Sequence, residues 1–260
     1  MSWSQITHDI QDSTITAVKP LIDSSYRRHL LKIGYMRSSF GGEESQIQDF
    51  NAGWQIKLNQ SWSISNDIAM LSGDNQKSYG FSHTLNFQKE RAGAGVTVRH
   101  SNNPLAPNSS LQLNSYKWLS EQLIIGGQIS RIDFSEVPIL WPFKLSTTWV
   151  SGKFGWTAGV TQDMSRLSSI DPLYNFSITH ETAKSDVFNI YCSVGSIYQP
   201  QFRLQLVENS STQLAFGGWF RKNISSVSSI TGGWGYTQIK DQNQSIIKIA
   251  QLHLSISHKL

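Results

Sequence analysis

Charged residues are scarce in this sequence, and long apolar runs are missing. Only 15% of the 260 residues are Asp, Glu, Lys or Arg, against roughly 25% in an ordinary soluble domain. No stretch approaches the ~18 consecutive apolar residues of a membrane-spanning helix. If the chain crosses a membrane, it must therefore cross as a closed sheet, because only helices and closed barrels satisfy every backbone hydrogen bond in lipid.

Other absences narrow the possibilities further. Cys192 is the only cysteine, which excludes an intramolecular disulfide and a zinc site built from cysteines. The segment from Met1 to Ser4 shows no basic stretch followed by an apolar core, so we expect no secretory signal there. The net charge of +4 is mild and scattered along the chain, and it does not indicate a nucleic-acid partner.

The stretch 78–100 shows most clearly what the sequence does contain. Positions alternate between apolar or aromatic and small polar residues on both sides of a charged turn, Lys89 to Arg91. A period of two predicts strands with one oily and one polar face, here paired as a hairpin. The polar face is rich in hydroxyl groups and poor in charge, which is typical of a barrel that meets lipid outside and water inside.

The same alternation recurs from Tyr26 to the C-terminus. It predicts about fifteen strands of about 8–11 residues, the length that a tilted strand needs to cross a bilayer. One of these strands is centred on Phe202 to Leu206, and another begins after Pro142, because prolines do not fit inside a central strand. A break in phase near Asn66 and Asp67 predicts a bulge.

We therefore predict an all-β fold: a transmembrane antiparallel β-barrel of about 14–19 strands in an up-and-down meander. Residues 26–260 form this single barrel domain. Residues 1–25 form a separate N-terminal segment, a short helix from Ser4 that stops before Pro20 or else an extended segment, held in the lumen.

Tryptophans support the membrane interpretation, although a soluble sandwich or propeller also buries aromatics at alternate positions. Seven of them fall within or at the ends of predicted strands, as they do in the aromatic girdles of membrane proteins: Trp54, Trp62, Trp118, Trp149, Trp156, Trp219 and Trp234. The low charge favours the membrane barrel over the soluble alternatives.

The polar faces of the strands would line a lumen. The titratable residues expected there are mostly basic: Lys32, Asp49, Lys57, Arg99, Lys153, Arg203 and His253. A mostly basic lumen would favour anions over cations through its fixed positive potential.

The sequence contains no motif typical of an enzyme active site. The seven histidines form no metal-ligand pair at helical or tight-turn spacing, and no phosphate-binding glycine loop is present. Glycine pairs such as Gly217 and Gly218 indicate places where strands bend or pack closely. We expect no enzymatic activity, no cofactor and no metal site.

Three motifs in residues 150–240 are similar in order and spacing to the later strands of the mitochondrial porin (VDAC) family. They are the stretches 155–159 (GWTAG), 181–185 (ETAKS) and 214–218 (LAFGG). The resemblance implies a nineteen-stranded barrel of an outer membrane, an N-terminal helix within the pore, and passage of anionic metabolites.

The function expected from these observations is passive diffusion of small, preferentially anionic solutes through a barrel in a mitochondrial or other organellar outer membrane. The alternative is a barrel that conducts nothing and serves as a scaffold or assembly subunit of an outer-membrane protein complex. The expected partners are the lipid bilayer, small anionic solutes and other outer-membrane proteins, with no nucleic acid.

Overall fold

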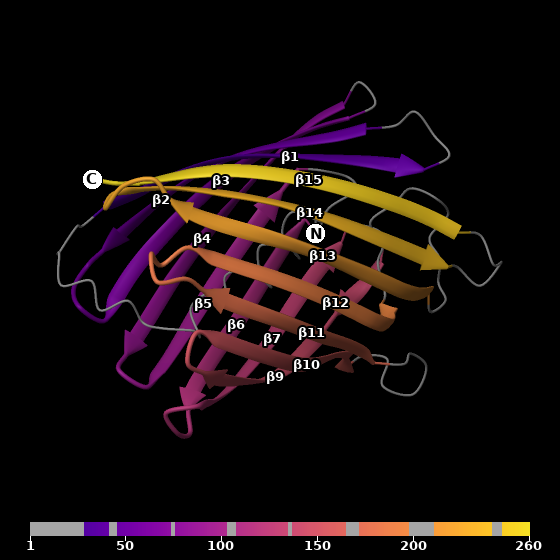
Figure 1. Cartoon of the computed structure of the whole chain (residues 1–260). Helices are drawn as coiled ribbons and strands as arrows, with labels where there is room; N and C mark the ends of the chain where they lie inside the picture. Colours follow the sequence, from indigo (N-terminus) through magenta and orange to yellow (C-terminus); the bar gives the residue numbers. More distant parts are fainter. Residues whose placement is uncertain are drawn as a thin grey trace.

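The computed structural model of the chain describes residues 29–41, 46–73, 76–102, 108–134, 137–164, 172–197, 211–240 and 246–260. These residues form fifteen strands of one sheet (Figure 1). The strands are β1 (His29–Gly41), β2 (Gln46–Lys57), β3 (Trp62–Gly73), β4 (Gln76–Lys89), β5 (Ala92–Ser101), β6 (Ser109–Trp118), β7 (Leu123–Phe134), β8 (Val137–Leu140), β9 (Pro142–Ser151), β10 (Phe154–Asp163), β11 (Leu173–Glu181), β12 (Val187–Ile197), β13 (Ser211–Asn223), β14 (Ser228–Lys240) and β15 (Ile246–Lys259).

The sheet closes on itself as a fourteen-stranded antiparallel barrel. Strands that follow one another in the sequence lie side by side, β1 pairs with β15, and β7 pairs with both β6 and β9. The short strand β8 only extends the far end of β7, where the register shifts between Ile132 and Phe134. This arrangement confirms the predicted transmembrane-type β-barrel and meander. It also corrects the count of nineteen strands that the resemblance to mitochondrial porins implied.

The two ends of the barrel differ in their connections. At one end, tight turns of two to five residues join the strands, for example Glu90–Arg91 between β4 and β5. The start of β1 and the end of β15 lie at this same end, where the Leu260 amide donates a hydrogen bond to the His29 carbonyl at 3.0 Å. The connections at the opposite end include the longest one, residues 198–210. We call these the short-turn end and the loop end.

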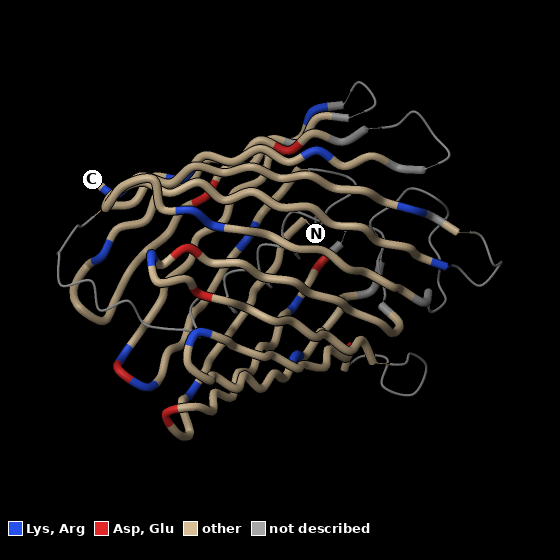
Figure 2. The backbone as a smooth tube through the Cα atoms, viewed as in Figure 1, with Lys and Arg blue, Asp and Glu red and all other residues tan. Residues whose placement is uncertain are grey.

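The outer face of the barrel is apolar. Side chains such as Ile33, Ile190 and Leu252, which point away from the lumen, are 69%, 69% and 65% exposed. An exposed apolar surface that runs all round a barrel would be unstable in water, whereas it matches a lipid environment. Figure 2 shows that the charged residues concentrate toward the strand ends and turns, which leaves most of the wall uncharged.

Aromatic pairs mark the outer face near the short-turn end. The rings of Trp62 and Phe87 lie 5.0 Å apart, and those of Trp149 and Trp156 lie 5.5 Å apart.

Two of the seven tryptophans expected in the girdle face the lumen instead. Trp118 pairs with the buried Ile124, and Trp219 is only 4% exposed.

The bulge predicted near Asn66 is absent. The register of β3 with β2 and with β4 runs unbroken through Asn66 and Asp67. Asn66 stays on the outer face, where its Oδ1 lies 2.6 Å from His83 Nδ1. A polar residue on the oily face, paired with a neighbouring histidine, therefore looked like a break in phase.

Two earlier predictions fall on residues that the structure does not describe: the N-terminal helix before Pro20 and the strand at Phe202 to Leu206. The predicted strand after Pro142 is confirmed as β9, which begins at Pro142 itself. In the described ranges, no helix is long and apolar enough to cross a membrane.

Candidate functional site

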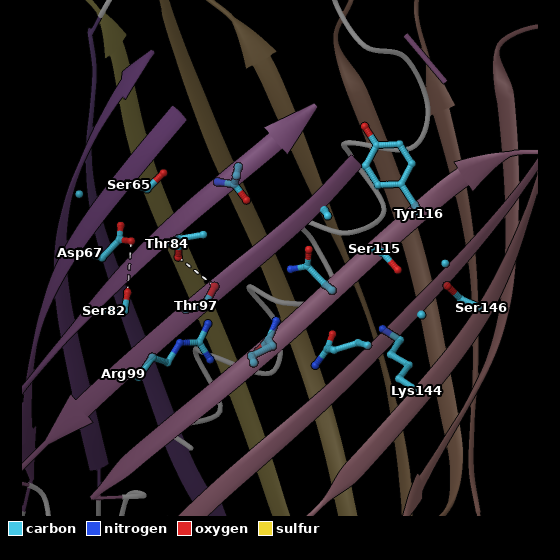
Figure 3. Close-up of a pocket in the computed structure, with 18 of the residues that line it drawn as sticks. Ser65, Asp67, Ser82, Thr84, Thr97, Arg99, Ser115, Tyr116, Lys144 and Ser146 are labelled. Atoms are coloured by element: carbon cyan, nitrogen blue, oxygen red, sulfur yellow. Dashed lines mark hydrogen bonds between the residues drawn. The ribbon is translucent and has the colours of Figure 1, made fainter. Parts of the chain in front are cut away.

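A cavity of about 430 Å³ lies inside the barrel. Its lining comes from β1 to β7 and β9 to β12, and the described residues of β13, β14 and β15 do not contribute to it. Most inward-facing side chains of this lining carry a hydroxyl or a carboxamide, because the alternation of each strand directs its polar positions to the lumen. Figure 3 shows several of them, including Ser65, Thr84 and Ser146, with the hydrogen bond between Thr84 and Thr97 at 3.0 Å. We call the part of this lining on β3 to β7 the open inner wall.

Five charged side chains line the cavity, and the two signs are nearly balanced. The cations are Lys32, Arg99 and Lys144, and the anions are Asp49 and Asp67. In the register of the sheet, Lys32 pairs with Gly53, Gly53 with Asp67, Asp67 with Ser82, and Ser82 with Arg99. Two cations and one carboxylate therefore alternate along a single row across β1 to β5.

The structure brings only part of the predicted lumen set together. Lys32, Asp49 and Arg99 line the cavity. Lys57 is the last residue of β2, exposed at the short-turn end opposite Ser63.

The remaining predicted lumen residues that the structure describes do not line the cavity. His253 faces inward on β15 opposite Gly233, but it is not one of the residues that line the cavity. Lys153 lies in the turn between β9 and β10, because β10 begins only at Phe154, so it does not project from a strand face. Arg203 falls outside the described residues.

Sequence reasoning missed two charged residues of the lining, Asp67 and Lys144. Asp67 was missed because a bulge was expected beside it. Its odd position, shared with Ser63 and Ser65, would have placed it correctly on the inner face. Lys144 follows two prolines, which obscured the phase of β9. Its pairing with Gln128 of β7 places it on the inner wall.

Glycines on the inner wall make room for polar side chains of neighbouring strands. A Cβ added at Gly93 would lie 2.7 Å from Cζ and 2.9 Å from Oη of Tyr116, so the tyrosine ring lies across Gly93. A Cβ at Gly95 would lie 2.7 Å from Asn86 Oδ1 and 2.8 Å from Asn114 Oδ1. Because these side chains lie along the wall, they leave the space in front of it open.

The inner face of β13 to β15, together with Met36 of β1, is packed instead. Its apolar side chains face inward and yet are nearly inaccessible: Ala215, Trp219, Ile239 and Ile249 are 4%, 4%, 6% and 0% exposed, and Met36 is 6% exposed. We call this surface the packed inner wall. This wall also buries polar side chains, among them Gln213, Thr237 and Gln251. The lumen is therefore polar and open on one side and filled by packed side chains on the other.

A tyrosine marks the border between the two walls. A Cβ at Gly217 would lie 2.6 Å from Tyr191 Oη, and a Cβ at Gly235 would lie 2.9 Å from the same atom. The ring of Tyr191 thus reaches from β12 across β13 to β14. Gly217 was predicted to be a place where strands bend or pack closely, and a neighbouring side chain does cover it. Gly235, which was not predicted, is covered by the same tyrosine.

The chemistry that this arrangement supports is hydration and passage of polar solutes. Hydroxyls and carboxamides both donate and accept hydrogen bonds, so they can replace part of a solute's water shell. Within the described ranges, no group of three or more His, Cys, Asp or Glu residues could hold a metal ion.

Neither a protein-family model nor a curated protein matches this sequence. Solved structures do match its fold, at low sequence identity. A bacterial polysaccharide outer membrane secretin is 13% identical over 90% of this chain and 99% of its own, with a TM-score of 0.54. A mutant of the TodX monoaromatic hydrocarbon channel is 7% identical over 90% and 91%, with a TM-score of 0.55. A FadL homologue from Pseudomonas aeruginosa is 8% identical over 89% and 90%, with a TM-score of 0.55. The chain therefore has the fold of an outer-membrane β-barrel.

Proposed function

We propose that this chain is an outer-membrane channel through which small hydrophilic solutes diffuse passively. The observation that carries the proposal is the combination of an apolar outer face with a hydroxyl- and amide-lined cavity inside one closed barrel. A barrel that only anchored a partner would not need a polar space in its interior. The fold relatives are named for different cargoes, a polysaccharide in one case and monoaromatic hydrocarbons in another, so they do not identify the solute.

The geometry favours a bacterial outer membrane over the mitochondrial one that the sequence resemblance implied. A barrel in which every neighbouring pair of strands is antiparallel must have an even number of strands, and this barrel has fourteen. Even numbers are the rule for bacterial single-chain barrels, whereas the mitochondrial porin has nineteen. By the same rule, the short-turn end would face the periplasm and the loop end the exterior.

We further propose a mild preference for anions. Three cations against two carboxylates line the cavity, so the fixed charge of the described lining is only slightly positive. The preference should therefore be weak and should depend on Arg99 and Lys144.

The test is single-channel recording of the refolded protein in planar bilayers, after carbonate extraction has shown that the protein is membrane-integral. Stepwise conductance supports the channel, and a membrane-integral protein that never conducts would refute it. In a KCl gradient, the reversal potential should favour chloride weakly. Arg99→Gln and Lys144→Gln should move it toward potassium, while the turn variant Lys153→Gln serves as the matched control and should leave it unchanged.

The N-terminal segment 1–25 is proposed, on its sequence pattern, to sit in the lumen and modulate conductance. Deletion of residues 1–24 should change gating without preventing insertion. Unchanged single-channel behaviour after the deletion would end this part of the proposal.

A scaffold that conducts nothing is the second candidate, and the packed inner wall is the observation that favours it. Side chains such as Trp219 and Ile249 already fill one side of the lumen. Recovery of a stoichiometric complex from detergent, together with absent conductance, would establish this alternative.

A further inference from the structure

The open inner wall holds a set of neighbouring uncharged side chains that play no part in the proposed anion preference. Six residues with a carboxamide or a phenol lie on β4, β6 and β7 and line the cavity: Asn86, Gln88, Gln112, Asn114, Tyr116 and Gln128. We call this set the amide track.

The sheet register places the members of the amide track next to one another. Gly93 pairs with Gln88 on one side and Tyr116 on the other, and Gly95 pairs likewise with Asn86 and Asn114. Asn114 in turn pairs with Gln128 on β7. The two glycines face the lumen two residues apart on β5, so a tyrosine ring and two carboxamides lie side by side over them.

The carboxamides of Asn86 and Asn114 in the track are available to a ligand. In the part of the chain that the structure describes, the carboxamides of Asn86 and Asn114 make no hydrogen bond to protein, and both side chains are partly exposed to the cavity. Gln112 lies two residues along β6 from Asn114 and is 6% exposed, and its Oε1 lacks a hydrogen-bond partner among the described residues. A buried acceptor without a partner is costly, so a donor brought by a ligand would stabilise it.

The centre of the track, over Gly93 and Gly95, is neutral. On β5 the first charged residue is Arg99, four residues beyond Gly95, which at about 3.4 Å per residue is roughly 14 Å away along the strand. At the edge of the track, Lys144 of β9 pairs with Gln128. Toward the loop end the uncharged lining continues through the hydrogen-bonded pair Thr84 and Thr97. A ligand over Gly93 and Gly95 would therefore meet hydrogen-bonding groups and a tyrosine ring, with charges only at the border of its site.

We propose that the amide track is a binding site for neutral saccharides. Each sugar hydroxyl both donates and accepts, as a carboxamide does, so the two kinds of group match without an ionic partner. The flat ring of Tyr116 offers a surface on which the C–H face of a sugar ring can be buried, while its hydroxyl stays polar. The proposal rests on the channel function and adds to it a class of solute, a short chain of uncharged sugar units.

The probe is maltohexaose, a neutral hexasaccharide, added to single channels of the full chain in planar bilayers. We expect transient blocks of the ion current in the wild-type protein. The double variant Asn86→Leu/Asn114→Leu should shorten the blocks about tenfold, because each lost hydrogen bond weakens binding by about two- to tenfold. Tyr116→Ala should shorten them by a similar factor.

The matched control is Asn51→Leu, which removes a carboxamide that lines the cavity from β2, outside the track. It should leave the block duration unchanged. Polyethylene glycol of the same hydrodynamic size should give no resolved blocks, because it lacks hydroxyl groups along its chain. Equal shortening by Asn51→Leu and by the double variant would overturn the assignment to the track.

Saturation-transfer NMR with maltohexaose and the protein in detergent micelles separates the two proposals. Saturation transfer from the wild-type protein to maltohexaose that is lost in the double variant supports the track, whether or not the protein conducts. A conducting channel that maltohexaose neither blocks nor contacts would refute the track and leave the channel function intact. Conductance that is absent while transfer persists would refute the channel function alone.

Discussion

The two inner walls of this barrel are built from the same alternating pattern and yet differ in what they do. On the open inner wall, side chains such as Asn86 and Tyr116 lie along the sheet over glycines and leave a cavity in front. On the packed inner wall, Trp219 and Ile249 face the same lumen and are almost fully inaccessible. The difference indicates that one side of the lumen provides stability and the other provides the polar surface for solutes.

The largest effect should come from Trp219→Ala. Removing this buried ring should destabilise the barrel by about 3–5 kcal/mol, because large-to-small changes lose both burial and packing. Urea unfolding in phospholipid vesicles measures the loss. Trp234→Ala is the matched control, since Trp234 lies on the adjacent strand, faces outward and is 50% exposed. Equal losses for both variants would remove the distinction between the walls.

A charge on the outer face should cost almost as much. Ile190 is 69% exposed, is the fourth of the eleven residues of β12, and faces lipid. Ile190→Arg should destabilise the barrel by up to about 2–4 kcal/mol, the range for cations at the bilayer midplane. Ser65→Arg, on the open inner wall, should change the same unfolding curve little because water hydrates it there. An equal cost for both would mean that the open inner wall is dry.

Two glycine variants compare the walls at the scale of one methyl group. A Cβ at Gly217 would lie 2.5 Å from the Trp234 carbonyl oxygen, a backbone atom that cannot turn aside. Gly217→Ala should therefore cost about 1–3 kcal/mol, as overpacking does. Gly95→Ala meets only the free ends of two asparagines, so it should be close to neutral. The same vesicle unfolding assay ranks the two, and the reverse order would contradict the model of the walls.

The smallest effect concerns the hydrogen bond between Thr84 and Thr97 on the open inner wall. Thr84→Val should cost about 0.5–1.5 kcal/mol, the usual net value of such a bond. A double-mutant cycle with Thr97→Val isolates the coupling between the two hydroxyls. A coupling of zero would show that water satisfies both groups equally well.

Much of the fold could be predicted from the sequence because strand alternation is a local property. The pairing of polar and apolar positions from 78 to 100 gave the correct faces for β4 and β5, and those faces indicated lipid outside and water inside. The prediction failed where a single residue contradicted its face. Asn66 on the oily side suggested a bulge, and the structure instead pairs it with His83 across the strands.

The candidate site was harder to predict than the fold. Alternation found Lys32, Asp49 and Arg99, but it could not say that Lys153 would fall in a turn. Nor could it separate Trp219, which packs inside, from Trp234, which faces lipid on the next strand. A tryptophan fits either face of such a strand, so its environment depends on the register with its neighbours.

The sequence by itself determined that this chain is a barrel with an oily outside and a polar inside, because a period of two assigns each residue to a face. Only the tertiary structure decided the number of strands, the antiparallel closure of β1 on β15, and which inward residues meet a cavity and which are packed. The physical reason is that these properties depend on register. Tyr116 lies over Gly93 and Tyr191 lies over Gly217 on neighbouring strands. Such contacts exist only once the register between strands is set, and the sequence of one strand does not specify that register.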